Sequence, residues 1–284
     1  MPSKTDFFRS ETGHFHGQWR LKGRIKDILF DARLRWEWMG LLAGGRMNEA
    51  PARNILIAAV EVPSRKADLK QVMQKLSRTR HKVTTIYAPC STGKGKFQNI
   101  NDGLRDVDLS PFDWMILVDD DIAFDEGFLD RFIYLAEATS LQVCMPAHKF
   151  RSNQTFNLTV RHWASLVRFT CFVESGPVTA FRKPMFPHVF PFPELKWAWG
   201  TDIAWSETAR ELGLSIGIVD GTPVRHLRPV GGSYDVRLAT DEAEAFLAAR
   251  NISRSRDDIL QTVKTMSGAD VLSAARRRQD ILTA

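Results

Sequence analysis

Trp114-Met115-Ile116-Leu117-Val118-Asp119-Asp120-Asp121-Ile122-Ala123-Phe124 joins five apolar residues directly to three consecutive carboxylates. A short apolar run bounded by polar residues is typical of a buried central strand. Three neighbouring acids repel one another unless a cation lies among them or water screens their charges. Because ligands bind at the carboxyl ends of strands in open α/β sheets, we expect these acids to enter a cleft and to hold Mg²⁺ or Mn²⁺. The alternative is an acidic turn in which Asp119 or Asp121 caps the following segment.

The residues before this run alternate between strand and helix patterns. Apolar, β-rich segments predict strands over 54–60 and 83–87. Apolar residues at helical spacing predict a helix after each of these strands, the first with Leu69, Val72, Met73 and Leu76 on one face. Strand–helix–strand–helix–strand over 52–121 predicts a parallel sheet with right-handed crossovers.

The rest of the chain continues the mixed pattern. We predict a helix around 129–136, strands over 141–145, 168–173, 178–181 and 215–219, and a helix over 202–212. Helical segments are expected over 240–262 and 269–282. The predicted fold class is α/β, with one catalytic domain at 51–239, an N-terminal arm and basic helix at 1–50, and C-terminal helices at 240–284.

Composition restricts the class of protein. Of the 284 residues, 44% are hydrophobic and 25% charged, as in soluble globular proteins. No apolar run approaches the roughly 18–20 residues that span a bilayer, and the N-terminus has no signal-peptide pattern. The three cysteines form no metal or disulfide pattern, so we expect a cytoplasmic protein. A net charge of +6 favours anionic partners such as nucleotide phosphates, an anionic membrane or nucleic acid.

Residues 20–42 form a basic amphipathic segment. Leu21, Ile25, Ile28 and Leu29 recur at helical spacing with arginines and lysines between them, and Trp36 follows. Such a helix can lie in a membrane interface. It can equally pack its apolar side against its own protein and leave its basic side in water.

Three further features follow the acidic run in the chain. Trp197-Ala198-Trp199-Gly200-Thr201-Asp202 is an aromatic, glycine-containing turn that ends in an acid at a helix start. His226 comes after the last predicted strand and is flanked by Arg225 and Arg228. Gly231-Gly232 predicts a flexible loop.

This order resembles the GT-A fold glycosyltransferases, which use nucleotide-sugar donors. The likeness covers about residues 52–235 and lies in Asp119-Asp120-Asp121, Trp199-Gly200-Thr201-Asp202 and His226. It implies a Rossmann-like mixed sheet flanked by helices. It also implies that Asp121 binds the metal directly, that Asp119 contacts the metal through water or the ribose, and that His226 completes the metal shell.

The resemblance assigns the remaining site residues. Asp202 is the expected general base, although an acid in the first turn of a helix is favoured electrostatically in any protein. Trp197 and Trp199 offer flat faces to a sugar, although tryptophans are more often core residues. The predicted substrate-binding residues are Trp197, Trp199, Gly200 and Glu174. The predicted nucleotide-binding residues are Glu61, Arg65, Lys96, Asn99, Asn101, Asp119 and Asp120.

Other enzyme classes fit less well. An Asp-x-Asp phosphatase wants Thr or Val where Ala123 stands, and a P-loop wants Ser or Thr after Lys94. A nucleotidyltransferase wants a glycine-rich basic loop where the first strand ends in Glu61-Val62-Pro63-Ser64. The remaining alternative is a non-catalytic basic protein that binds nucleotide, nucleic acid or membrane, and no nucleic-acid motif is present.

We therefore predict a metal-dependent glycosyltransferase that uses Mn²⁺ or Mg²⁺. It would move a sugar from a nucleoside diphosphate sugar, expected to be UDP-linked, to a hydroxyl of a glycan or lipid-linked saccharide, as in polysaccharide biosynthesis. We expect no nucleic-acid partner. The hypothesis for the basic N-terminal segment is peripheral contact with the inner face of a membrane.

Overall fold

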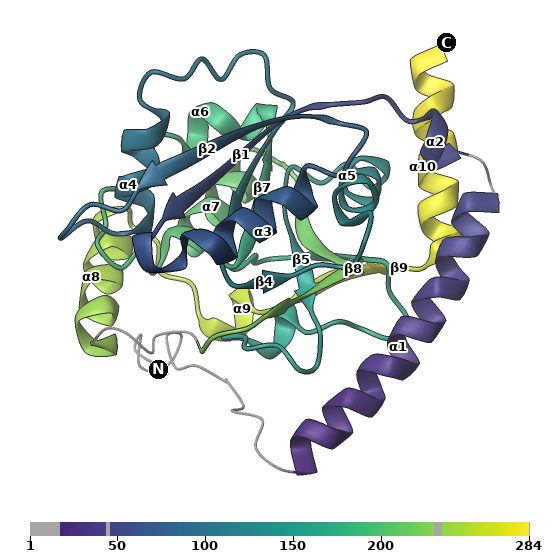
Figure 1. Ribbon diagram of the computed structural model, residues 1–284, viewed down its shortest axis with the longest axis horizontal. Helices are drawn as coiled ribbons and strands as arrows, with labels where there is room; N and C mark the ends of the chain where they lie inside the picture. The colour runs from purple at the N-terminus through teal and green to yellow at the C-terminus, as the bar shows by residue number, and fades with distance from the viewer. Residues whose placement is uncertain (1–17, 44–45, 230–234, 284) are drawn as a thin grey trace.

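The computed structural model describes residues 18–43, 46–229 and 235–283 (Figure 1). The predicted arm before residue 18 and the Gly231-Gly232 loop lie outside these residues. None of the described helices is long and apolar enough to cross a bilayer.

A mixed sheet runs through the molecule in the order β2-β1-β3-β7-β5-β8-β6-β9. Its strands are β1 (Asn54–Glu61), β2 (Lys82–Pro89), β3 (Trp114–Val118), β5 (Val143–His148), β6 (Val167–Thr170), β7 (Val178–Arg182), β8 (Ile216–His226) and β9 (Thr262–Met266). β1 is parallel to β2 and β3, whereas β7 is antiparallel to both β3 and β5. The α/β class with a mixed sheet is confirmed.

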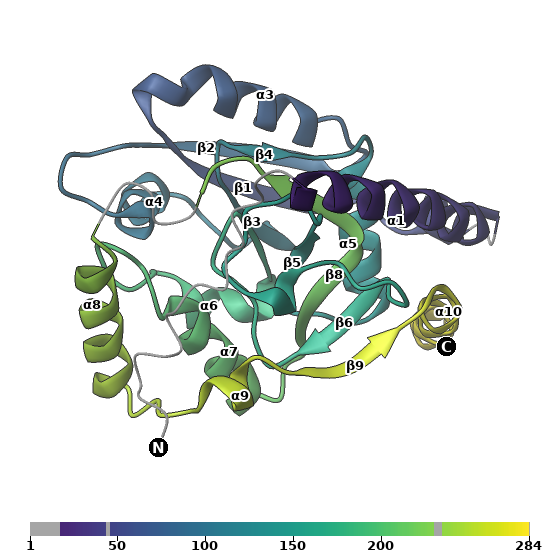
Figure 2. The same cartoon turned by 90° about the horizontal axis from the view of Figure 1, so that it is seen from below.

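Helices flank the sheet on both faces (Figure 2). They are α1 (Gln18–Ala43), α2 (Arg46–Glu49), α3 (Lys66–Leu76), α4 (Lys96–Leu104), α5 (Phe128–Ala138), α6 (Phe186–Val189), α7 (Thr201–Glu211), α8 (Val236–Ala249), α9 (Arg256–Ile259) and α10 (Gly268–Thr283). The division of the chain into an N-terminal arm, a catalytic domain and C-terminal helices stays a prediction.

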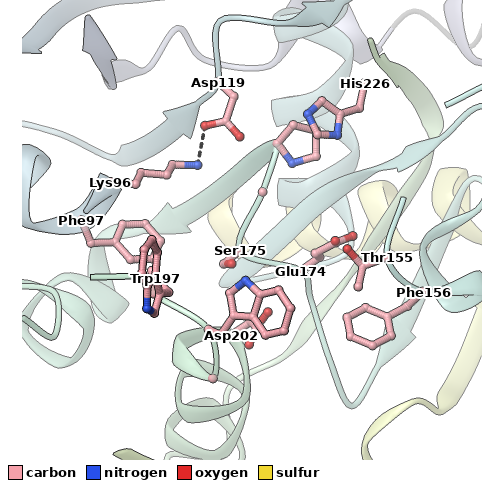
Figure 3. A pocket seen from close by; sticks show the side chains of 15 residues that line it. Lys96, Phe97, Asp119, Thr155, Phe156, Glu174, Ser175, Trp197, Asp202 and His226 are labelled. Carbon is pink, nitrogen blue, oxygen red and sulfur yellow. Dashed lines mark ion pairs between the residues drawn. The ribbon is translucent and has the colours of Figure 1, made fainter. Parts of the chain in front are cut away.

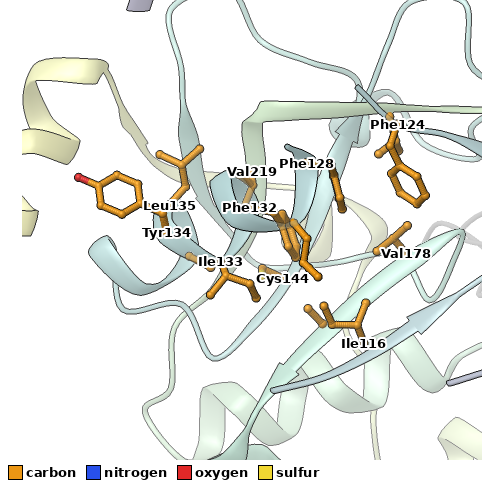
Figure 4. Packing of buried hydrophobic residues seen from close by; sticks show 14 of the residues in the cluster. Ile116, Phe124, Phe128, Phe132, Ile133, Tyr134, Leu135, Cys144, Val178 and Val219 are labelled. Carbon is orange, nitrogen blue, oxygen red and sulfur yellow. The ribbon is translucent and has the colours of Figure 1, made fainter. Parts of the chain in front are cut away.

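Successive side chains of β1 and β3 point to opposite faces of the sheet, and each face carries its own hydrophobic cluster. Ile55 and Ile57 of β1 face the cluster that α3, α5 and parts of α1 and α10 cover. Leu56 and Ala58 face the cluster that α4, α6 and α7 cover. Figure 4 shows the first cluster, where Phe128 and Phe132 of α5 lie near Ile116 and Val178. A strand with apolar residues on both faces must be central, as the sequence predicts for β3.

The prediction of one helical segment over 240–262 is wrong. α8 ends at Ala249, α9 is a single turn, and Thr262–Met266 forms strand β9. β9 pairs antiparallel with β6, so the edge of the sheet supplies backbone hydrogen bonds that a periodicity count does not register. Residues 262–266 therefore form a strand because β6, which is distant in the sequence, pairs with them.

A short strand brings the acids and the predicted histidine together. β4 (Ile122–Ala123) follows Asp121 immediately and pairs antiparallel with the end of β8, so Ile122 lies opposite His226. The amide N–H of Leu227 also donates to the carbonyl oxygen of Asp121, over 2.9 Å. The backbone itself thus fixes the histidine beside the carboxyl end of β3.

Candidate active site

The three acids after β3 point to three different basic partners. Asp119 forms an ion pair with Lys96, with 2.6 Å between carboxylate and ammonium. Asp120 lies 2.9 Å from the guanidinium of Arg228. Asp121 lies 3.2 Å from Nε2 of His226. Opposite charges therefore relieve the repulsion that the sequence predicts within the run.

Asp120 also faces Arg65, at 3.8 Å. Burial raises the pKa of Asp120, and the two arginines oppose that rise without cancelling it. The guanidinium of Arg228 extends further to Asp68, at 2.6 Å. Arg65 and Arg228 thus form a positively charged rim beside the acids, one from the short turn after β1 and one from the segment after β8.

His226 is oriented by the backbone on its other side. Its Nδ1 lies 3.2 Å from the carbonyl oxygen of Asn153, so Nδ1 must carry the hydrogen and donate. Nε2 then faces Asp121 either as a protonated imidazolium or with a lone pair that can bind a cation. Burial lowers the pKa of His226, but the hydrogen bond and charge of Asp121 outweigh it and raise the pKa overall.

This pair of donors fits part of a divalent-metal shell. An imidazole nitrogen and a carboxylate oxygen on one side of a cleft suit Mn²⁺ better than Mg²⁺. Asp119, the third predicted ligand, is turned to Lys96. Among the described residues, no group of three or more His, Cys, Asp or Glu is gathered closely enough to hold a metal by itself. Phosphate oxygens and water would therefore have to supply the other ligands.

A cavity of about 630 Å³ opens in front of the acids. Ligand pockets commonly have volumes of about 300–1,000 Å³. Its walls carry both acids and cations from several elements: Val60, Val62, Arg65, Cys90, Lys94, Lys96, Asn99, Val118, Asp119, Asp120, Asp121, His226, Arg228 and Pro229. The cavity has the size and the charged lining that a nucleoside diphosphate with a bound cation would need.

A smaller cavity of about 170 Å³ adjoins it (Figure 3). Lys96, Asp119 and His226 line both cavities. The remaining wall is aromatic and acidic and consists of Phe97, Thr155, Phe156, Glu174, Ser175, Gly176, Pro177, Trp197, Ala198, Trp199, Gly200 and Asp202. The structure thus brings Asp202, both tryptophans and Glu174 to one pocket beside the acidic run. Their roles in catalysis and sugar binding stay predictions.

Asp202 lies in the first turn of α7 at this smaller cavity. Gly200 precedes the helix with φ of +83°, a left-handed conformation that favours glycine. The amide N–H of Ile203 donates to Oδ1 of Asp202 over 3.0 Å. Burial raises the pKa of Asp202 to about 7, and the charge of Glu174 adds to the rise. A carboxyl group with this pKa can accept a proton near neutral pH.

The loop that carries the tryptophans is anchored from two sides. The amide N–H groups of Lys196 and Trp197 each donate to the carboxylate of Glu242 on α8, over 2.8 Å. Gly95 lies so close to this loop that an added Cβ would stand 2.0 Å from the carbonyl oxygen of Lys196. Backbone contact at Gly95 therefore fixes the loop against the start of α4.

A buried histidine that the sequence analysis did not select lies behind Glu174. His148 is fully buried and its Nδ1 lies 2.7 Å from the hydroxyl of Ser152. Its Nε2 is 3.6 Å from Oε2 of Glu174, and neither atom has a hydrogen-bond partner among the described residues. A lone histidine at the end of a strand carries no motif, so only the folded arrangement brings it to notice.

Other predicted residues have structural contacts instead. Asn99 lines the larger cavity, but its carboxamide accepts from the N–H of Ser91 and donates to the carbonyl of Gly95. Asn101 bonds the backbone of Phe192. Neither Asn101 nor Glu61, which pairs with Lys66, is among the described residues that line the two cavities. Their predicted contact with nucleotide stays a prediction.

The chain is similar to known proteins in its three-dimensional structure. No family model matches the chain, and no curated protein matches it. Among solved structures, the fold is similar to a Drosophila β1,4-galactosyltransferase 7 variant in complex with manganese, UDP-Gal and xylobiose. The TM-score is 0.44 at 14% sequence identity, over 66% of this chain and 79% of that chain.

Proposed function

We propose that the protein is a metal-dependent glycosyltransferase that takes a sugar from a nucleoside diphosphate sugar. The observation that carries this proposal is the pair of adjoining cavities that share Lys96, Asp119 and His226. The larger holds the nucleoside diphosphate, and the smaller receives the sugar and the acceptor hydroxyl. The bond between the sugar and the diphosphate, which breaks in the reaction, then lies where the two cavities meet, beside the shared charged residues.

Charge on the departing diphosphate is the main electrostatic demand of such a reaction. Lys96, Arg65 and Arg228 lie around the larger cavity and can neutralise part of it. Asp121 and His226 would hold the divalent metal, which supplies further neutralisation of the diphosphate when bound. Mn²⁺ is the metal that this nitrogen–oxygen pair favours.

The acceptor hydroxyl must lose its proton as it attacks the anomeric carbon. Asp202 is the group that we assign to this step, because it lines the smaller cavity and its pKa of about 7 keeps a useful ionised fraction near neutral pH. Trp197 and Trp199 offer apolar faces against which a sugar ring can stack. UDP as the nucleotide, and a glycan or lipid-linked saccharide as the acceptor, belong to the same proposal.

Calorimetric titration with UDP and GDP, each with and without Mn²⁺, tests the donor half. Wild type should bind one nucleotide far better with metal than without. Asp121→Asn should lose the metal-dependent part by at least about tenfold, whereas Asp106→Asn, which removes an exposed carboxylate outside both cavities, should bind as wild type does. Folded wild-type protein that shows no metal-dependent binding would overturn the proposal and favour a non-catalytic basic protein.

A further inference from the structure

Helix α1 presents an apolar stripe to solvent. Leu21, Ile25, Ile28, Leu29, Trp36 and Met39 are each 51–75% exposed. At 100° per residue they fall on one face, and at 1.5 Å per residue the stripe is about 27 Å long. Contiguous exposed apolar surface of this kind marks an interaction site more often than chance.

The opposite face of α1 attaches to the body of the protein through polar groups. The carboxylate of Asp27 accepts from the amide N–H groups of Phe150 and Arg151, over 2.8 and 3.2 Å. Asp31 accepts from the guanidinium of Arg161, over 2.6 Å. An amphipathic helix normally buries its apolar side in its own protein. In α1 the acids face inward over most of its length, and the apolar stripe faces outward.

Near the C-terminal end of α1, apolar contacts complete the attachment. Trp38 and Leu41 are buried in the hydrophobic cluster that α5 covers. The indole N–H of Trp38 donates to the carbonyl oxygen of Gly221 over 3.0 Å. α1 lies along one side of the protein (Figure 1), and these contacts attach its inner side to the body. The outer stripe therefore has a fixed orientation relative to the sheet.

Basic side chains border the stripe on both sides. By helical angle, Lys22 and Lys26 lie along one border, and Arg24 and Arg35 lie along the other. All four are exposed. An apolar strip between two rows of cations is complementary to a lipid surface, where acyl chains receive the apolar groups and anionic headgroups meet the cations.

We propose that α1 docks the protein in the plane of an anionic lipid bilayer through this stripe. A second copy of the chain is a poorer occupant. Two stripes that face each other would bring their basic borders together and oppose association. The proposal concerns attachment alone and does not depend on the proposed transfer reaction.

Co-sedimentation of the full chain with lipid vesicles tests the proposal. Wild type should bind vesicles that contain 30% phosphatidylglycerol at least about tenfold more tightly than vesicles of phosphatidylcholine alone. The variant Ile25→Ser/Ile28→Ser/Trp36→Ser should lose at least about tenfold of this binding. The control Leu212→Ser/Val263→Ser removes exposed apolar side chains from other elements and should bind as wild type does.

A second variant separates charge from apolar contact. Lys22→Gln/Arg24→Gln removes one cation from each border and should weaken binding to the anionic vesicles by about fivefold per residue. It should leave binding to phosphatidylcholine vesicles unchanged. Circular dichroism and the urea unfolding midpoint of each variant should match wild type.

Three outcomes would overturn the proposal. Wild type could fail to bind anionic vesicles. The stripe variant and the Leu212/Val263 control could lose binding equally. Wild type could sediment as a dimer that the stripe variant converts to monomer, in which case the stripe is an interface between copies of the chain.

Discussion

Replacing Asp202 by Asn should stabilise the protein, and increasingly so as the pH rises. The folded pKa of this carboxyl is about 7, against 3.8 as the ordinary value that the unfolded chain should show. Between these values the unfolded chain has lost the proton and the folded chain keeps it. The unfolded state then binds fewer protons, so the free energy of unfolding falls as the pH rises from about 4 to about 7.

The size of the effect follows from the two pKa values. Relative to a side chain that is always neutral, ionisation of Asp202 costs about 2 kcal/mol of folding free energy at pH 5 and about 4 kcal/mol at pH 8. Asn keeps the shape of the group and an oxygen that can accept from the N–H of Ile203. The free energy of unfolding of the variant should therefore rise relative to that of wild type by about 2–3 kcal/mol between pH 5 and pH 8.

Urea unfolding of both proteins at several pH values measures this difference directly. Asp106→Asn removes an exposed carboxylate and should show no comparable growth. The same Asp202→Asn protein should lose transferase activity by about 10²–10⁴-fold if the carboxylate is the general base. A stability difference that stays constant with pH would refute the assignment of a raised pKa, whatever happens to activity.

Three other substitutions test separate contacts. Gly176→Ala places a Cβ 3.3 Å from the Asp119 carboxylate, so calorimetry should show nucleotide binding weakened by about tenfold while the unfolding midpoint stays near wild type. Arg228→Gln removes a charged donor from the larger cavity and should weaken binding of the preferred nucleotide, UDP or GDP, by about tenfold, with the loss shrinking at high salt. Asp220→Ala leaves the buried guanidinium of Arg168 without its carboxylate and should lower the free energy of unfolding by about 3–5 kcal/mol in urea titration. Adding Arg168→Met should restore only part of this loss, because the N–H of His162 and the carbonyls of Leu158 and Val160 also lose their partners.

The part of the fold that the sequence could predict is the part set by local pattern. The run before Asp119 has apolar residues at every position, and this requires burial on both faces of the strand. The alternation of strand and helix over 52–121 then requires parallel neighbours, and β1 is parallel to both β2 and β3 as expected. The grouping of Asp202, Trp197 and His226 around the acids came from the family resemblance, since nothing local joins them.

The parts that could not be predicted depend on partners distant in the chain. β9 is a strand because β6 offers it an edge, and Asn101 is held by the backbone of Phe192, 91 residues away. The orientation of α1 is another such case. Its periodicity indicates an amphipathic helix, but only the contacts of Asp27 and Asp31 show which side faces the protein.

The contrast between two buried pairs of polar side chains indicates where a ligand belongs. Asp220 accepts from the guanidinium of Arg168 and from the N–H of His162, so this pair has the satisfied geometry of a structural contact. Glu174 and His148 are also buried, yet the facing atoms stand 3.6 Å apart and lack hydrogen-bond partners among the described residues. A buried polar group left unsatisfied costs about 1–3 kcal/mol. A protein is expected to retain unsatisfied groups of this kind where a bound substrate forms the missing hydrogen bonds. Glu174 lines the smaller cavity together with Asp202, so this cavity is the place where we expect such a substrate.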